Sequence, residues 1–124
     1  MFERENFFQI PQFLTLSEVM GLREQVRLLR PQFRAATIGS LKLLEKTIRS
    51  DQICWIDAAT TAASLPLQSY FAQLEVLRKS LNEKYFLGLK SVDSHFALYH
   101  PNTFYERHLD VSSEKPSARK VSLV

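Results

Sequence analysis

The sequence predicts an α+β domain in which helices support a sheet. Two stretches repeat their apolar residues at helical spacing, whereas the stretch from Val92 onward alternates like a strand. At 124 residues the chain can form one domain, which would bury roughly two-thirds of the surface that the unfolded chain exposes. Apolar residues make up 45% of the sequence and charged residues 23%, as in soluble globular proteins.

The first predicted helix begins after Thr15. Thr15 and Glu18 have the spacing of a capping box, in which the side chain of each residue accepts a hydrogen bond from the backbone amide of the other. Pro31 ends the helical pattern. The apolar positions are Leu16, Val19, Met20, Val26 and Leu29. We expect this apolar face to pack against another element.

The second predicted helix is the longest. Ser64 and Pro66 are typical of a helix start, and Gly88 is typical of a helix end. One face carries Leu67, Tyr70, Phe71, Leu74, Leu77, Leu81 and, at its end, Phe86. We expect this helix to lie against the sheet.

Five stretches have the composition or the alternation of strands. They are residues 33–39, 52–56, 92–99, 104–111 and 119–124. The first is closed by a turn at Gly39, and residues 40–51 form either a short helix or an exposed loop. Residues 100–103 predict a turn, in which Asn102 tolerates a left-handed backbone better than most residues other than glycine.

Charge and composition limit the possible partners and the compartment. The formal charge of +3 comes from 16 basic and 13 acidic residues. They are interleaved along the chain, except that the basic residues Lys115, Arg119 and Lys120 lie close together. Three basic residues form a weaker positive patch than nucleic-acid-binding proteins usually have. No stretch approaches the roughly 20 apolar residues of a membrane span. Cys54 is the only cysteine, which fits a reducing compartment, so we expect a cytoplasmic protein.

His108 and Asp110 form the candidate metal-binding pair. Residues two apart on a strand point to the same face, so an imidazole nitrogen and a carboxylate oxygen can meet one ion. A facial Fe(II) site needs one more protein ligand, normally a second histidine. The pair alone has low specificity, because a histidine on a strand is more often structural.

Two longer motifs raise the specificity of this interpretation. The run HFALYHPNTFYERHLD, residues 95–110, resembles the ligand-bearing strand of the prolyl-hydroxylase branch of the 2-oxoglutarate/Fe(II)-dependent dioxygenases. TIRSDQICWID, residues 47–57, resembles the Ile-Arg-(Gly/Ser)-Asp-x-x-x-Trp segment of the same egl-nine-like and bacterial prolyl 4-hydroxylase-like branch. The two motifs occur in the expected order, and the resemblance covers most of the chain.

The resemblance implies a fold. That fold is a double-stranded β-helix, or jelly roll, buttressed by helices and here incomplete at the C-terminus. Residues 1–124 would then be the N-terminal portion of a single oxygenase domain. Its helical support would cover about 1–90, and the first core strands of the jelly roll about 91–124.

The resemblance also implies a metal and a co-substrate. His108 and Asp110 match the first two iron ligands of the family. Tyr99 matches a tyrosine that hydrogen-bonds 2-oxoglutarate. The implied cofactors are therefore Fe(II), with 2-oxoglutarate as co-substrate and ascorbate as an accompanying reductant.

The implied partner is a protein substrate. Arg49, Asp51 and Trp55 match a segment that borders a mobile loop closing over this substrate. The implied reaction is hydroxylation of a prolyl residue, driven by oxidative decarboxylation of 2-oxoglutarate to succinate and carbon dioxide.

The sequence departs from the family pattern after Asp110. The family's second histidine ligand, and the basic residue that binds the distal carboxylate of 2-oxoglutarate, lie several strands beyond the metal pair, whereas this sequence ends at Val124. His95 and His100 both precede the pair. We interpret His95 as a polar strand residue on the Tyr99 face, with a chelating role as the alternative.

This departure leaves two functions open. The chain is either a fragment of a longer enzyme, in which case we expect the 124 residues alone to be almost inactive, or a truncated relative. The truncated relative would be a non-catalytic interaction module that pairs its open sheet edge with a partner or with itself.

Overall fold

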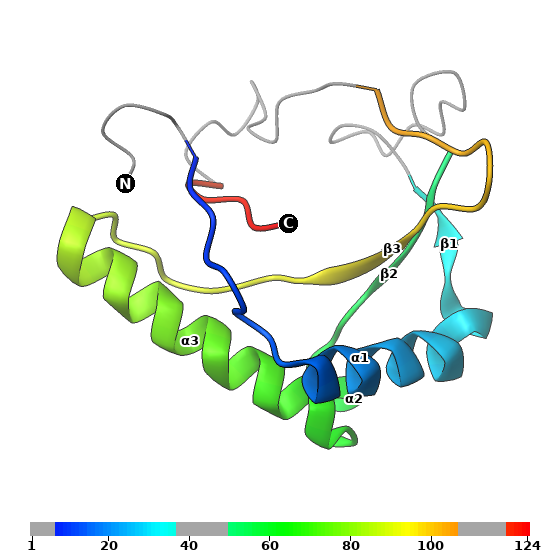
Figure 1. Ribbon diagram of the computed structural model, residues 1–124, viewed down its shortest axis with the longest axis horizontal. Coiled ribbons are helices and arrows are strands. Elements are labelled where there is room, and N and C mark those ends of the chain that lie inside the picture. The colour runs from blue at the N-terminus through cyan, green and yellow to red at the C-terminus, as the bar shows by residue number, and fades with distance from the viewer. Residues whose placement is uncertain (1–6, 37–49, 107–118) are drawn as a thin grey trace.

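The computed structural model describes residues 7–36, 50–106 and 119–124. Its elements are α1 (Leu16–Leu29), a 3₁₀ turn η1 (Arg30–Gln32), β1 (Arg34–Ala35), β2 (Gln52–Trp55), α2 (Ala58–Ala62), α3 (Leu65–Tyr85) and β3 (His95–Leu98). The strands form one antiparallel sheet in the order β1-β2-β3, and the helices lie on one side of it (Figure 1). The predicted mixture of helices and strands is confirmed, whereas the jelly roll, predicted to be incomplete at the C-terminus, stays a prediction.

The start of α1 follows the predicted capping box. The Glu18 amide donates to Thr15 Oγ1 at 3.2 Å, and the Thr15 amide donates to Glu18 Oε1 at 3.1 Å. Gln73 of α3 donates a further hydrogen bond to the other oxygen of the Glu18 carboxylate. The Thr15 amide, the Thr15 side chain and the Gln73 side chain, in that order of effect, hold the pKa of Glu18 below its usual value.

The predicted apolar face of α1 is wrong over its first half. Leu16 is 78% exposed and Met20 is also exposed, and Leu29 is the buried residue of this helix. The helix instead approaches α3 at Gly21, where an added Cβ atom would lie 3.2 Å from Pro66 Cγ. A Cβ atom at Gly21 would require Pro66 to shift by a few tenths of an ångström, so the small residue permits this close approach of the two helices.

The start and the apolar face of α3 are confirmed. The Leu67 amide donates to Ser64 Oγ at 3.3 Å, and Pro66 occupies the first turn, where its missing N–H costs no hydrogen bond. Leu67, Leu74 and Leu81 are buried, so this face packs as the sequence pattern predicts.

The end of α3 differs from the prediction. The helix stops at Tyr85 instead of continuing to Gly88, because the Asn82 side chain forms hydrogen bonds with the loop that follows. Asn82 Nδ2 donates to the Leu89 carbonyl at 2.9 Å, and its Oδ1 accepts from the Leu89 amide at 2.7 Å. This turn forces Phe86 into the left-handed conformation, with φ at 55° and 90% of its surface exposed. Phe86 is therefore not part of the apolar face.

The core lies between the end of α1 and one face of the sheet. Leu29, Phe33 and Cys54 form its buried centre, and the partly buried residues packed against them are Val26, Phe96 and Leu98. Cys54 pairs with Phe96 across the β2–β3 ladder. The alternation predicted for residues 92–99 is confirmed within the strand His95–Leu98, where Phe96 and Leu98 face the core.

The short helix α2 was not predicted. Asp57 caps it, since its Oδ1 accepts from the Thr60 amide at 2.7 Å. The same hydrogen bond lowers the pKa of Asp57. No helix within the described ranges has the length and apolarity required to cross a bilayer.

The prediction of a strand at residues 119–124 is wrong. These residues form no strand, and the Lys120 ammonium donates to the Leu87 carbonyl at 2.8 Å. The segment therefore contacts the loop after α3 instead of pairing with a strand.

The predicted turn at residues 100–103 is confirmed. The Thr103 amide donates to the His100 carbonyl at 3.0 Å, and Asn102 has a φ of 69°. The chain then returns to Ser50, whose amide donates to the Phe104 carbonyl at 2.7 Å. Gly39 and residues 107–111 lie outside the described ranges.

Replacing Phe86 by glycine should stabilise the protein. A left-handed backbone costs a residue with a Cβ atom about 1 kcal/mol relative to glycine. Phe86→Ala removes the same aromatic ring but keeps the Cβ atom, so it is the matched control. We expect the Phe86→Gly variant to exceed the Phe86→Ala variant by about 1 kcal/mol in the free energy of unfolding, measured in urea. Equal stabilities would contradict the strain at this position.

Glu18 should contribute to acid sensitivity. Its pKa is lowered in the folded state, so its stabilising effect is fully present above the unfolded-state pKa of about 4.3. That effect is lost as the pH falls through the lower folded-state pKa. Urea unfolding at a series of pH values should show a smaller loss of stability on acidification in Glu18→Gln than in the wild type. The exposed Glu83→Gln control should behave like the wild type.

Candidate functional site

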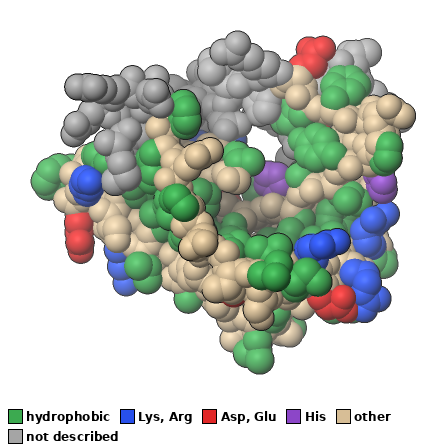
Figure 2. Space-filling model, in the orientation of Figure 1, with side chains coloured by type: hydrophobic (Ala, Val, Ile, Leu, Met, Phe, Trp, Pro, Cys, Tyr) green, Lys and Arg blue, Asp and Glu red, His purple; other side chains and the backbone are tan. Residues whose placement is uncertain are grey.

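One face of the sheet lies opposite the core and carries the candidate site. Trp55 pairs with His95, and Ile53 pairs with Ala97, across the β2–β3 ladder. Tyr99 continues the same alternation. We call these five residues the open sheet face, because Trp55 is 54% and Tyr99 48% exposed. In the space-filling view, the molecule is hollowed near its middle, with a histidine side chain at the margin of the hollow (Figure 2).

Trp55 and His95 form an aromatic pair on this face. Their ring centroids are 4.6 Å apart and their planes are inclined by 56°. The backbone beneath them is fixed, since the Ile56 amide donates to the Ser94 carbonyl at 3.1 Å. The Tyr70 hydroxyl lies 3.1 Å from Ser94 Oγ and links this end of the ladder to α3.

Asp51 and Tyr99 lie at the other end of the ladder. Asp51 precedes Gln52, Tyr99 follows Leu98, and Gln52 pairs with Leu98. Asp51 is buried, and its carbonyl accepts from the Ala36 amide at 3.0 Å. Asp51 and Trp55 are four positions apart along the chain, which is roughly 13 Å in a strand. Of the three predicted substrate-contacting residues, the two that the structure describes therefore lie at opposite ends of β2 and do not form one cluster.

The remaining predicted site residues fall outside the described ranges. These are His108, Asp110 and Arg49. Within the described ranges, no group of three or more His, Cys, Asp or Glu side chains could hold a metal ion. The iron ligation by His108 and Asp110 therefore stays a prediction.

Cys54 lies on the opposite side of β2 from the open sheet face. Burial raises the pKa of its thiol, and the negative charge of Asp57 raises it further. The neutral thiol behaves as a small apolar core residue. We therefore assign it no chemical role in the site.

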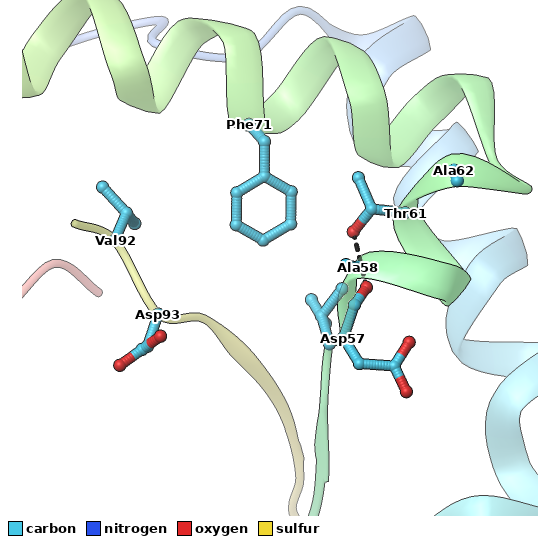
Figure 3. A pocket seen from close by; sticks show the side chains of 8 residues that line it. Asp57, Ala58, Thr61, Ala62, Phe71, Val92 and Asp93 are labelled. Carbon is cyan, nitrogen blue, oxygen red and sulfur yellow. Dashed lines mark hydrogen bonds between the residues drawn. The ribbon is translucent and has the colours of Figure 1, made fainter.

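A separate pocket of about 560 Å³ lies on the helical side of the sheet. It is lined by Ile56, Asp57, Ala58, Thr61, Ala62, Phe71, Val92 and Asp93, and the Phe71 ring points into it from α3 (Figure 3). The Asp57 carboxylate is engaged in capping α2, and its pKa is lowered by that contact. None of the predicted site residues that the structure describes, Asp51, Trp55 and Tyr99, lines this pocket, so it is not the candidate active site.

Sequence reasoning missed the association of His95 with Trp55. The alternation of residues 92–99 placed His95 on the Tyr99 face, as the structure has it. Its partner depends on the register between two strands that are distant in the sequence. Local periodicity contains no signal for that register.

Comparison with known proteins supports this arrangement of helices and strands. No protein-family model matches the chain, and no curated protein matches it. The chain is 37% identical to a solved structure described as a Pseudomonas putida prolyl-4-hydroxylase, with a TM-score of 0.70. The match covers 80% of this chain and 51% of that one, so this chain spans about half the length of that protein. The described elements thus have part of a prolyl-hydroxylase-like fold.

Proposed function

We propose that this chain is the N-terminal portion of an Fe(II)- and 2-oxoglutarate-dependent dioxygenase that hydroxylates a prolyl residue of a protein substrate. The observation that carries the proposal is the likeness to a prolyl-4-hydroxylase, which extends over most of the chain in both sequence and structure. The HxD pair and the IRSDQICW segment, found independently in the sequence, support the same activity.

The donor types of His108 and Asp110 suit Fe(II). One imidazole and one carboxylate are two of the three protein ligands of a facial iron site. The third ligand and the anchor for the distal carboxylate of 2-oxoglutarate are not assigned to any residue of this sequence. When bound, iron and 2-oxoglutarate would supply the activation of dioxygen that oxidises a substrate C–H bond.

The open sheet face supplies residues for binding and orientation. The phenolic O–H of Tyr99 would donate a hydrogen bond to 2-oxoglutarate and so fix its position relative to the metal ligands. Trp55, at the other end of the face, would contact the protein substrate, for which a half-exposed indole is well suited. Arg49 and Asp51 would border the substrate. Ascorbate would keep the metal in its reduced state.

Anaerobic titration with Fe(II) and 2-oxoglutarate tests the metal site. The full-length natural protein should develop the weak visible charge-transfer band of the iron–2-oxoglutarate chelate. His108→Ala and Asp110→Asn should abolish the band, because each removes one of the metal ligands. His100→Ala is the matched control and should retain it, since His100 lies in the turn beside Gln52.

Turnover should differ between the 124-residue chain and the complete enzyme. We expect the 124 residues alone to produce little or no succinate from 2-oxoglutarate. Stoichiometric succinate production by these residues would contradict the incomplete-site interpretation. A full-length protein that gives no absorption band would count against the proposed function itself.

The alternative function is a non-catalytic interaction module. Two observations favour it: β1 and β3 are the outer strands of the described sheet, and the open sheet face exposes aromatic side chains. An outer strand can pair with another chain through its free backbone groups. Sedimentation velocity at several concentrations should then show self-association of the 124-residue chain. A well-folded chain that stays monomeric at every concentration would argue against self-pairing.

A further inference from the structure

The contact between Trp55 and His95 suggests a function for His95, a residue to which the family resemblance assigns none. Trp55 is half-exposed, so burial alone does not fix the orientation of its indole ring. The backbone on both strands is held in place by the ladder and by the Ile56–Ser94 hydrogen bond of 3.1 Å. What remains to be fixed is the orientation of the indole side chain.

His95 is placed to fix that orientation. It is the direct cross-strand partner of Trp55, and the 4.6 Å separation of the ring centroids is within the range of aromatic pairs. The rings are inclined by 56°, so the imidazole contacts the indole at an angle, and Trp55 remains 54% exposed. Cross-strand aromatic pairs of this kind restrict side-chain rotation and stabilise the sheet locally.

Ala97 is the next residue of β3 on the open sheet face, and it pairs with Ile53 across the ladder. Tyr99 comes next, four residues from His95, or roughly 13 Å along the strand. The Trp55–His95 pair is therefore separated from the predicted 2-oxoglutarate-binding tyrosine by the Ile53–Ala97 pair.

We propose that His95 is a positioning residue that holds Trp55 as a rigid aromatic wall against the prolyl ring of the substrate. The inference rests on the proposed function, since it takes the substrate to be a proline-containing segment. Holding the indole in advance avoids the entropy lost when a mobile side chain is ordered on binding. His95 thus acts through Trp55 and not on the reacting atoms.

The contact can be measured without any enzymatic activity. Trp55 is the only tryptophan, so the intrinsic fluorescence of the chain reports on this one indole. His95→Ala should increase quenching by acrylamide and lower the fluorescence anisotropy of Trp55. His95→Phe, which keeps a ring at this position, should restore both toward wild-type values. His100→Ala should leave both unchanged, and an equally unchanged His95→Ala would overturn the positioning role.

Binding of a short oligoproline peptide tests the substrate part. The full-length natural protein should show a saturable change in tryptophan fluorescence, and His95→Ala should weaken the apparent affinity about threefold to tenfold. His95→Phe should recover most of the loss. With a hydroxylatable peptide, the same substitution should raise KM more than it lowers kcat.

The outcomes distinguish the two proposals. If the wild-type protein responds to oligoproline and His95→Ala responds equally well, the positioning role is overturned while the proposed function stands. If the wild-type protein neither responds to the peptide nor forms the iron–2-oxoglutarate band, the prolyl substrate and the proposed function fail together. Weakened binding in His95→Ala, with rescue by His95→Phe, supports the inference.

Discussion

The pairing of β2 with β3 is the constraint on which the other features depend. Side chains alternate along both strands, so one register places Cys54, Phe96 and Leu98 against the helices. The same register places Trp55 and His95 on the opposite face. A shift by one residue would move the indole into the core and the thiol out to solvent. Burial of the small core therefore determines which aromatic side chains remain accessible.

Much of the local structure could be predicted because its causes lie within a few residues. Thr15 and Glu18 cap α1 through mutual hydrogen bonds three residues apart. Ser64 caps α3 by accepting one hydrogen bond from the Leu67 amide, and Asn102 adopts the left-handed backbone that its turn requires. In each case the sequence contains both partners of the interaction at a fixed spacing. Such signals need no knowledge of the tertiary fold.

The errors arose where a contact outside the local pattern decides the outcome. Gly21 of α1 lies close to Pro66 of α3, and helical periodicity alone could not identify that approach. The hydrogen bonds between Asn82 and Leu89 end α3 before Gly88, although neither residue belongs to a recognised helix-end pattern. The candidate site shows the same division. Tyr99 was placed on its face by alternation, whereas the Trp55–His95 contact required the register between two strands.

The two faces of the ladder separate the stabilising core from the proposed substrate-binding surface. Burying apolar side chains on the core face stabilises the domain by about 25 cal/mol per Å², whereas the half-exposed indole and phenol on the other face forgo part of that gain. Both faces share the same backbone, so the ladder that aligns Cys54 with Phe96 also aligns Trp55 with His95. A recognition surface on a packed strand is more precisely positioned than one on a loop. A three-stranded sheet can in this way orient an aromatic side chain without enclosing it.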